Sequence, residues 1–523
     1  MNARCLRPPG RTLGTLTLAL ALAVPLQAGG ITRSGGVLGD SVTYDLSGNA
    51  GIIYAFLPSL TQGPTPLAIF DPSDLRVMDV GLDLIDLLTI SVFDGAGQSQ
   101  VSFPLPAAPT LQGLVLYSQL VEVPLAPTFF GDLSAQNAVT LGLPGSSAPT
   151  AFDNVFNHVG HTATLLDDGR VLVTGGNDYD DQGNENQLRA IVIYDPQTEC
   201  FTQQLNDLTT ERGAHGAIKL QDGKVLIIGG ANAANNAIPD AEIWDPATGM
   251  STLVAPMTTG RALPSMVLLN DGRVFVSGGV ANYNSGDIVG SLASAKRETE
   301  VYNPVNDTWT PGPLLPKGRA GHGASLLGDG LVLLTGGLEV TVIFGVPIPE
   351  ISNDCRRYDP VTNTLLATAP FNGNRALHGQ VALPNGNALI AGGAFAELIT
   401  LSVQTFASTR VYDFQSNTWT DTADMNEARG FPQLVLAGNA TLGHKVACLA
   451  GIGSADINGF NPSAAVETAP VTISAWTQHQ DMVQLRTIPL STVIEDGTRI
   501  LTTGAKFPEG SLPVNTAEIF NVP

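Results

Sequence analysis

A unit of about 55 residues recurs through most of this chain, from His161 to the C-terminus. Six copies open with an arginine that lies three residues before a histidine or a proline. These arginines are Arg212, Arg261, Arg319, Arg375, Arg429 and Arg486, and in the first copy His158 takes the same place. Self-similarity at a fixed spacing means that each copy builds one small unit that packs against its neighbours.

Each copy continues with an apolar run broken by a tight turn, as in Leu165 to Val173 around Asp168-Gly169. A pair of glycines follows, and then an aromatic residue, an acidic residue and a proline, as in Tyr194-Asp195-Pro196. Short apolar runs between turn residues are typical of strands. Seven copies therefore predict an all-β, seven-bladed β-propeller.

The order Arg-x-x-His, Gly-Gly, Tyr-Asp-Pro and Thr-Trp resembles the kelch repeat, over residues from about 152 to 523. It is also similar to the central domain of the galactose oxidase family. This resemblance implies the fold, and it implies function much less, because one fold hosts many activities.

The N-terminal part divides into three segments. Residues 1–28 combine arginines with a short apolar stretch and small residues before Gly29, which is the layout of a secretory signal peptide. Residues 32–142 contain short apolar runs between glycines and prolines, which predicts a small β-sandwich like those attached to large secreted bacterial proteins. Residues 143–151 have the composition of a linker, and 152–523 would form the propeller.

The C-terminal repeat copy stops after its third strand, at Ala517 to Asn521. A blade that lacks its outer strand leaves a sheet edge open. We therefore expect the stretch near Phe152 to Phe156 to complete the last blade.

The charge of the chain limits the classes of partner that it can bind. The sequence has 25 basic and 47 acidic residues, a net charge of −22, which argues against binding nucleic acid or anionic membranes. No apolar stretch after the signal is long enough to span a bilayer. We expect a protein that is secreted, extracellular or in the cell envelope.

Cys200, Cys355 and Cys448 fall in different copies, so we expect no disulfide.

The six repeat arginines are the first candidate binding residues. They could encircle the propeller axis and form a rim that binds anionic ligands such as acidic sugars, because guanidinium groups pair bidentately with carboxylates. Alternatively, each arginine caps backbone carbonyls or pairs with an aspartate of the Tyr-Asp-Pro element, such as Asp195, Asp245 or Asp359. Because a residue that occurs once per repeat usually serves the repeat, the structural interpretation is favoured.

The sequence bears on two metals, calcium and copper. Asp178, Asp180 and Gln182 lie in an Asp-x-Asp-x-x-Gly loop that could bind calcium, although a solvated acidic loop is the favoured interpretation. The galactose oxidase resemblance implies a copper site with a tyrosine before the histidine. Here that place is taken by Gly160, Ala214, Leu263, Gly321, Leu377, Phe431 and Ile488, so we expect no copper. Packing is the favoured role of His161, His215, His322 and His378.

The sequence leaves the question of enzymatic activity open and favours a non-catalytic role. No catalytic motif is recognisable, so no catalytic residue is assigned. The leading hypothesis is a secreted propeller that binds an extracellular glycan or protein on the face with the long connections. The alternatives are a carbohydrate-active enzyme or divergent galactose-oxidase-like oxidoreductase, and a structural envelope protein.

Overall fold

The structure is a computed structural model of the chain. It describes residues 30–124, 129–154, 159–179, 185–284, 290–291, 293–343, 346–397, 402–440, 442–456, 459–486, 489–504 and 516–523. The predicted signal peptide, residues 1–28, lies outside this set. The described residues form strands, turns and four 3-10 segments, η1 (Leu67–Ile69), η2 (Ile85–Leu87), η3 (Pro109–Leu111) and η4 (Glu495–Gly497), and the all-β prediction is confirmed.

The chain divides into two compact units. The first comprises Met1–Asp153 with Tyr194–Thr202 and Pro523, and the second comprises Asn154–Ile193 and Gln203–Val522. The domain boundaries expected from the sequence stay predictions.

The first unit contains two larger sheets, of order β1-β2-β7 and β6-β3-β8-β9, and the hairpin β4-β5. Its strands are β1 (Gly30–Gly35), β2 (Ser41–Ser47), β3 (Ile53–Ser59), β4 (Gln62–Pro66), β5 (Val77–Val80), β6 (Thr89–Val92), β7 (Gln98–Pro104), β8 (Val115–Val123) and β9 (Asn137–Thr140).

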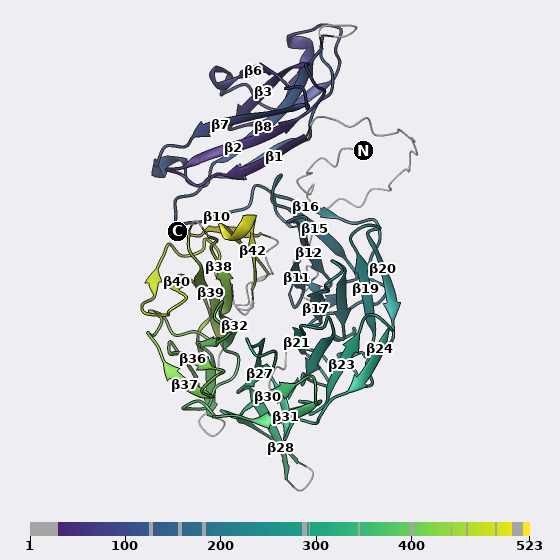
Figure 1. Cartoon of the computed structure of the whole chain (residues 1–523), viewed down its shortest axis with the longest axis vertical. Coiled ribbons are helices and arrows are strands. Elements are labelled where there is room, and N and C mark those ends of the chain that lie inside the picture. The colour runs from purple at the N-terminus through teal and green to yellow at the C-terminus, as the bar shows by residue number, and fades with distance from the viewer. Residues whose placement is uncertain are drawn as a thin grey trace. The chain divides into compact units, whose positions relative to one another are not determined.

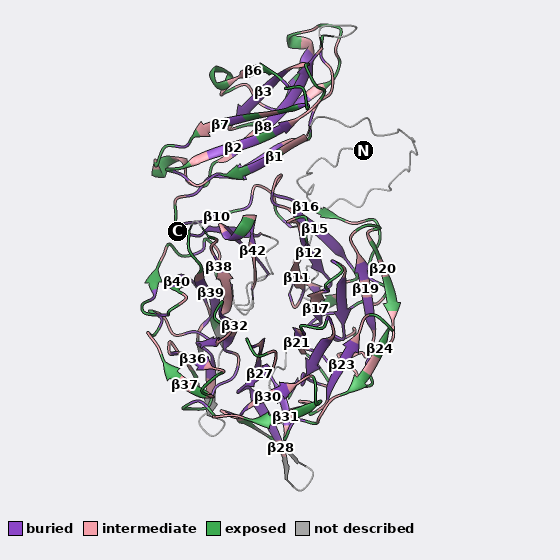
Figure 2. Cartoon of the chain, viewed as in Figure 1, coloured by how far each residue is buried: buried purple, intermediate pink, exposed green. Residues whose placement is uncertain are grey.

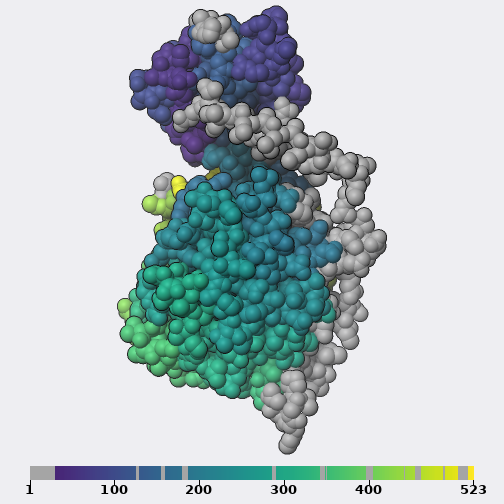
Figure 3. Space-filling model, turned by 90° about the vertical axis from the view of Figure 1, so that its right-hand side faces the viewer, coloured from purple at the N-terminus to yellow at the C-terminus, as the bar shows by residue number. Residues whose placement is uncertain are grey.

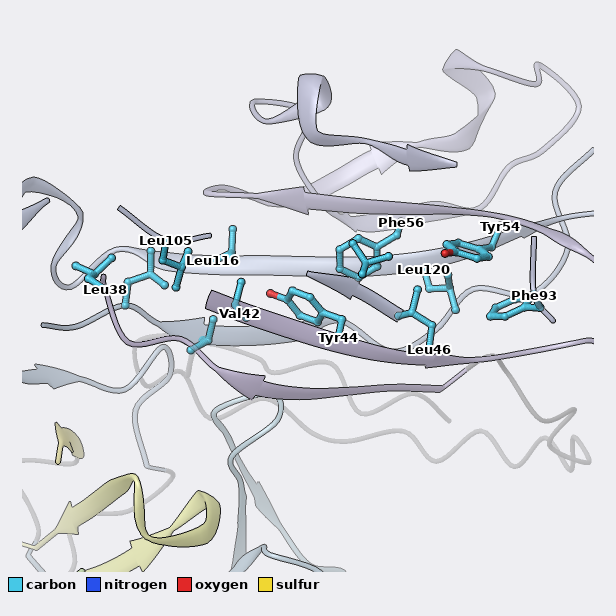
Figure 4. Close-up of a cluster of buried hydrophobic side chains, with 13 residues drawn as sticks. Leu38, Val42, Tyr44, Leu46, Tyr54, Phe56, Phe93, Leu105, Leu116 and Leu120 are labelled. Atoms are coloured by element: carbon cyan, nitrogen blue, oxygen red, sulfur yellow. The ribbon is translucent and has the colours of Figure 1, made fainter. Parts of the chain in front are cut away.

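An apolar core lies between these two sheets. Along β2 the side chains of Val42, Tyr44 and Leu46 are buried at alternate positions, as expected for a strand with one face inward. The Tyr44 ring lies 4.8 Å from the ring of Phe56 on β3, centroid to centroid. Figure 4 shows side chains from both sheets meeting in this cluster. The arrangement is that of a β-sandwich.

The repeat region, residues 162–521, is built mainly from four-stranded sheets, one for each copy of the repeat. In the first five sheets, the order along the sheet follows the order along the chain. The first sheet contains β11 (Thr162–Leu165), β12 (Val171–Thr174), β15 (Ile191–Asp195) and β16 (Cys200–Gln203), and the second contains β17 (Gly216–Lys219), β18 (Val225–Ile228), β19 (Ala241–Asp245) and β20 (Met250–Val254). The third contains β21 (Ser265–Leu268), β22 (Val274–Ser277), β23 (Thr299–Asn303) and β24 (Thr308–Pro311), and the fourth contains β26 (Gly323–Leu326), β27 (Val332–Thr335), β30 (Cys355–Asp359) and β31 (Thr364–Ala367). The fifth contains β32 (Gly379–Ala382), β33 (Ala388–Ala391), β36 (Thr409–Asp413) and β37 (Thr418–Asp421).

The last two repeat copies depart from this pattern. The sixth belongs to a larger sheet containing β34 (Ala394–Glu397), β35 (Ser402–Thr405), β38 (Gln433–Ala437), β39 (Lys445–Asp456), β40 (Gly459–Pro470) and β41 (Thr477–Gln478). The last sheet has the order β10-β44-β43-β42, made of β10 (Ser147–Pro149), β42 (Leu490–Ile494), β43 (Arg499–Thr503) and β44 (Glu518–Asn521).

The extra strand of the last sheet comes from residues expected to form the linker. We predicted a strand near Phe152 to Phe156, whereas the sheet takes Ser147–Pro149. Ala148 is buried there, and a residue that precedes proline is restricted to extended backbone.

The first strands of the repeat copies contact one another in a closed cycle. Neighbouring strands are in contact along the order β11, β17, β21, β26, β32, β38 and β42. The cycle closes where β42 lies against β11. Figure 1 shows these strands around a common axis, which is a β-propeller. Because the last two copies are irregular, the blade count of seven stays a prediction.

Burial is concentrated in the second strand of each regular blade. The strands β12, β18, β22, β27 and β33 are buried at every position, and Figure 2 shows this as purple bands within the blades. The fourth strands β20, β24, β31 and β37 are largely exposed, and Figure 3 gives a side view of the outer surface. The apolar layers between blades therefore form the core of the propeller.

The glycine pairs join each blade to the next. Gly230 has a φ of +95°, and a Cβ placed on it would lie 2.8 Å from the carbonyl oxygen of Gly213. Its backbone N–H donates to the carbonyl of Arg261, which opens the next copy, at 2.9 Å. Only glycine allows this conformation and this close approach without strain.

Candidate functional site

The connections between the second and third strands of the blades define one face of the propeller, which we call the long-connection face. Because strands alternate in direction, the turns between the third and fourth strands lie on the opposite face. Two of the long connections form separate sheets, β13 (Asn177–Tyr179) with β14 (Glu185–Gln187), and β28 (Leu338–Ile343) with β29 (Val346–Ile351) and β25 (Gly318–Ala320). A third forms the hairpin of β34 with β35, which joins the larger sheet of the sixth copy.

The six repeat arginines lie inside the blades and are all buried. Five of them pair with carboxylates. The pairs are Arg212 with Glu242, Arg261 with Glu300, Arg319 with Glu339 and Asp354, Arg429 with Glu467, and Arg486 with Glu518. These six guanidinium groups therefore do not form an exposed rim.

The Arg212 site shows how one such pair is satisfied. Its Nη2 donates to Glu242 Oε1 at 2.7 Å, and its Nη1 donates to the carbonyl of Gly229 at 2.7 Å. The other carboxylate oxygen of Glu242 accepts from the Thr209 N–H and the Ser251 hydroxyl, both at 2.7 Å. Burial lowers the pKa of Arg212, and Glu242 opposes that shift.

The arginines cap carbonyls, as the structural interpretation expected, but the acidic partners differ from those expected. The aspartates of the Tyr-Asp-Pro element were the predicted partners, whereas in three blades the partner is a glutamate two residues before the aromatic residue, as in Glu242 before Trp244. This glutamate recurs at Glu300 and Glu518, so the repeat itself carried the signal. Arg319 and Arg429 pair instead with Glu339 and Glu467, which occupy other positions. Asp245 faces the exposed Lys224 instead, at 3.7 Å.

Arg375 is the exception among the six. Its guanidinium donates to the carbonyls of Gly392 and Ser408 and to the Ser408 hydroxyl, and it lies over the rings of Phe371 and Phe406. No ion pair joins it to a carboxylate within the described residues. Its pKa is lowered to about 10, by burial first and by the nearby Arg410 second.

Arg410 occupies the place where other blades carry the glutamate. Arg410 pairs with Ile390 of the second strand, in the same register as Glu242 with Ile227. The fifth blade thus has a cation where the second has an anion.

The histidines link neighbouring blades. His215 Nε2 is hydrogen-bonded to the Thr174 hydroxyl of the preceding blade at 3.1 Å, and His322 to Ser277 at 2.9 Å. His378 is bonded to Thr335 at 2.7 Å, and His161 to Thr503 at 2.8 Å. Burial, aided by the neighbouring arginines, lowers the pKa of His322 and of His378 to about 3. These contacts give the histidines a packing role.

The position before each histidine or proline does not fit a copper ion. Ala214, Leu263, Leu377 and Phe431 have φ values of +48° to +56°, and each donates its backbone N–H to the equivalent residue of the preceding blade. None of their side chains can bind a metal. His215 and His378 follow Ala214 and Leu377 and bond the preceding blade through Nε2, whereas prolines follow Leu263 and Phe431. These positions therefore lack the tyrosine-histidine pair that the galactose oxidase resemblance implies.

The calcium candidate is only partly covered by the structure. Asp178 lies in β13, whereas Asp180 and Gln182 lie outside the described residues. Elsewhere in the described chain, no group of three or more His, Cys, Asp or Glu side chains has the arrangement of a metal site. Calcium binding stays a prediction.

The cysteines depart in part from expectation. Cys355 and Cys448 are free and buried. Cys200 is disulfide-bonded. The expectation of no disulfide is therefore wrong.

A charged cleft of about 340 Å³ opens on the long-connection face beside β28 and β29. Its lining residues are Pro316, Lys317, Glu339, Glu350, Ile351, Ser352, Asn353, Asp354, Arg356 and Asn374. Sequence reasoning missed this cleft, because its charges occur once and not in every repeat.

Salt bridges connect the walls of the cleft. Lys317 pairs with Glu350 and lies 3.7 Å from Glu339, while Arg356 pairs with Asp354 at 2.9 Å. The Lys317 ammonium lowers the pKa of Glu350, and the pKa of Lys317 is raised in turn. The side chains of Lys317 and Glu350 are 40% and 47% exposed, so both charges remain accessible to a partner.

Comparison with curated proteins supports the kelch resemblance. The chain is 30% identical over 224 residues to Kelch-like protein terF of Aspergillus terreus, which covers 40% of this chain and 44% of that protein. It is 30% identical over 128 residues to Kelch-like protein 33 of Homo sapiens, covering 24% and 22%. The chain thus spans less than half the length of these relatives. No family model matches the chain.

A solved structure has a similar fold. A fungal alcohol oxidase of the AA5 family in complex with copper superposes with a TM-score of 0.56 at 15% identity, covering 72% of this chain and 76% of that chain. At this identity the likeness concerns the fold alone. Together with the four-stranded sheets, it establishes a kelch-type β-propeller fold.

None of the described helical segments is long and apolar enough to cross a bilayer.

Arg410→Glu should give a more stable propeller than Arg410→Gln, because both variants lose the Arg410–Asp421 ion pair and only the glutamate gives the buried Arg375 a carboxylate. We expect Arg410→Glu to raise the free energy of unfolding by about 1–2 kcal/mol relative to Arg410→Gln, which removes the repulsion without adding an acid. Urea unfolding of the full chain measures the difference, and an Arg410→Glu chain no more stable than Arg410→Gln would refute it.

The buried histidines should make the propeller sensitive to mild acid. His322 and His378 have folded pKa values of about 3, below the unfolded value of about 6.5. The stability that they contribute is therefore complete above pH 6.5 and is lost as the pH falls toward 3. Each histidine should add a slope of about 1.4 kcal/mol per pH unit in this window.

Urea unfolding at pH 7.5, 6.5 and 5.5 tests this slope. His378→Gln should reduce the slope by the contribution of about one proton, which is about 1.4 kcal/mol per pH unit. The double variant His322→Gln, His378→Gln should reduce it by about twice as much. An unchanged slope in both variants would contradict the assignment of buried, neutral imidazoles.

Proposed function

We propose that the propeller is a non-catalytic binding module whose partner is a protein that docks on the long-connection face. The curated relatives carry the name Kelch-like protein, and the cleft beside β28 and β29 offers a site for such a partner. Variable connections held on a rigid scaffold commonly carry binding sites.

The exposed charges of the cleft carry this proposal. Lys317 and Glu350 pair at the surface, and such a pair contributes only about 0–1 kcal/mol. Each can exchange its present partner for a charge on another protein at little cost. Charges of both signs in one cleft favour a partner with a complementary pattern, and such complementarity gives specificity.

The buried network below the cleft favours a preformed site. Asp354 accepts from the fully buried Arg319 at 2.6 Å and from Arg356, so its carboxylate is fixed from the blade interior. Glu339 also pairs with Arg319. Residues held before binding lose less entropy when the partner arrives.

The positions of the histidines support a non-catalytic role. His322 and His378 are buried between blades and bonded to hydroxyls, and their pKa values lie far from those of a general base at neutral pH. The runner-up is an oxidoreductase. Metal analysis of the purified protein tests it, because stoichiometric copper would overturn the non-catalytic assignment.

We further propose that the protein is exported to the extracellular space or the cell envelope. The support is the signal-like pattern of residues 1–28 and the net charge of −22. In that compartment a glycan is the competing ligand class.

Photo-crosslinking can test the docking face. A photoreactive residue at the exposed Ile348 of β29 should capture one protein from envelope or culture fractions, and the same group at the exposed Val361, in the turn between β30 and β31, should not. Adding Lys317→Glu should reduce the yield at Ile348 by about tenfold, because it breaks the charge pattern.

Two results would refute this proposal. One is an equal yield at Val361, which lies on the opposite face. The other is glycan-array binding that Lys317→Glu abolishes while no protein is captured at Ile348, which would assign the cleft to a glycan.

A further inference from the structure

A second cleft, of about 620 Å³, lies in the first unit and is separate from the proposed propeller site. One wall is the turn that follows η1, and the other is formed by residues 129–132. Its lining residues are Asp71, Ser73, Asp74, Leu75, Arg76, Phe129, Phe130, Gly131 and Asp132. We call it the sandwich cleft.

Arg76 ties the two walls together. Its Nη2 pairs with Asp74 at 2.7 Å on its own wall. Across the cleft, its Nη1 donates to the carbonyl of Gly131 at 2.7 Å, and its Nη2 donates to that of Phe130 at 3.0 Å. The guanidinium is thus committed to the structure, and the cleft is formed before any ligand arrives.

Large apolar side chains are exposed at this cleft. Phe129 is 45% exposed and Leu75 is 89% exposed, and Phe70 beside them is 48% exposed. The Phe130 ring contacts those of Phe129 and Phe70 edge-on, at 4.8 and 6.3 Å between centroids. Contiguous apolar surface of this kind on a soluble domain marks an interaction site.

The charge of the surroundings selects the partner. Residues 30–153 contain eleven acidic residues and two arginines, and Asp71 and Asp132 line the cleft itself. Both arginines are engaged, since Arg33 donates to the carbonyls of Gly35 and Pro196. The field at the cleft is therefore negative and attracts cations. The same field repels acidic proteins, anionic lipids and, at a net charge of −22, a second copy of this chain.

We propose that the sandwich cleft binds a protein segment that combines lysine or arginine with large apolar side chains. The apolar side chains cover Leu75 and Phe129, and the cations pair with Asp71 and Asp132 and lie over the exposed phenylalanine rings. This site goes beyond the proposed function of the propeller and does not depend on it.

The test uses the full chain and a labelled heptapeptide that alternates lysine with leucine or phenylalanine, at about 150 mM salt. The comparison peptides replace lysine with glutamate, or the apolar residues with serine. We expect the basic, apolar peptide to bind at least about tenfold more tightly than either comparison peptide, because both parts of the cleft contribute.

Three variants separate this site from general attraction to an acidic protein. Phe129→Ser and Leu75→Ser leave the charge unchanged and should each weaken binding about tenfold, whereas Ile90→Ser removes an exposed apolar side chain on β6 and should have no effect. Leu75 is so exposed that its variant should fold normally.

Binding that is equal in wild type, Phe129→Ser and Leu75→Ser would overturn the proposal. Failure of the basic, apolar peptide to bind better than the serine peptide would do the same. If a neutral hexasaccharide binds and loses affinity in Phe129→Ser while the peptide does not, the cleft belongs to a glycan. None of these outcomes bears on crosslinking at Ile348, so the two proposals fail separately.

Discussion

A buried arginine paired with a buried carboxylate organises the propeller. The guanidinium of Arg212 holds Glu242 and two carbonyls of its own blade, while the backbone carbonyl of Arg212 accepts from Gly176 of the preceding blade at 2.9 Å. One residue thus closes its own sheet through its side chain and joins the neighbouring sheet through its main chain. A buried ion pair stabilises the fold only when its remaining hydrogen-bonding groups are also satisfied. Here Thr209 and Ser251 donate to the second carboxylate oxygen of Glu242 and meet this condition.

This arrangement separates residues that serve the repeat from residues that can serve a partner. The arginines, the glycine pairs and the histidines recur at fixed positions, and the backbone bond from the second glycine of a pair to the next arginine is the same in successive blades. The two clefts are built from residues without such recurrence, such as Lys317 and Glu350 in the propeller and Leu75 and Phe129 in the first unit. Binding specificity on a repeat scaffold comes from such individual positions.

The sequence was sufficient to predict the fold, because every repeat copy carries the same residues at the same structural positions. Gly230 marks the end of the second strand of one blade and Arg261 precedes the first strand of the next, and both could be assigned from spacing alone. Glu242, Glu300 and Glu518 also recur, but the aspartates of the Tyr-Asp-Pro element are the more conspicuous acids of the repeat, so the pattern indicated the wrong partner. The clefts could not be predicted, since Lys317, just before β25, and Glu350, on β29, are brought together only by the tertiary fold.

The most direct test is a double-mutant cycle on Arg212 and Glu242, whose side chains are fully buried. Unfolding free energies would be measured for Arg212→Met, Glu242→Leu and the double variant. Our account predicts that Glu242→Leu alone costs about 3–5 kcal/mol, because it leaves a buried cation unpaired, and that removing Arg212 as well recovers part of this loss. Losses that simply add, with no coupling between the two sites, would contradict it.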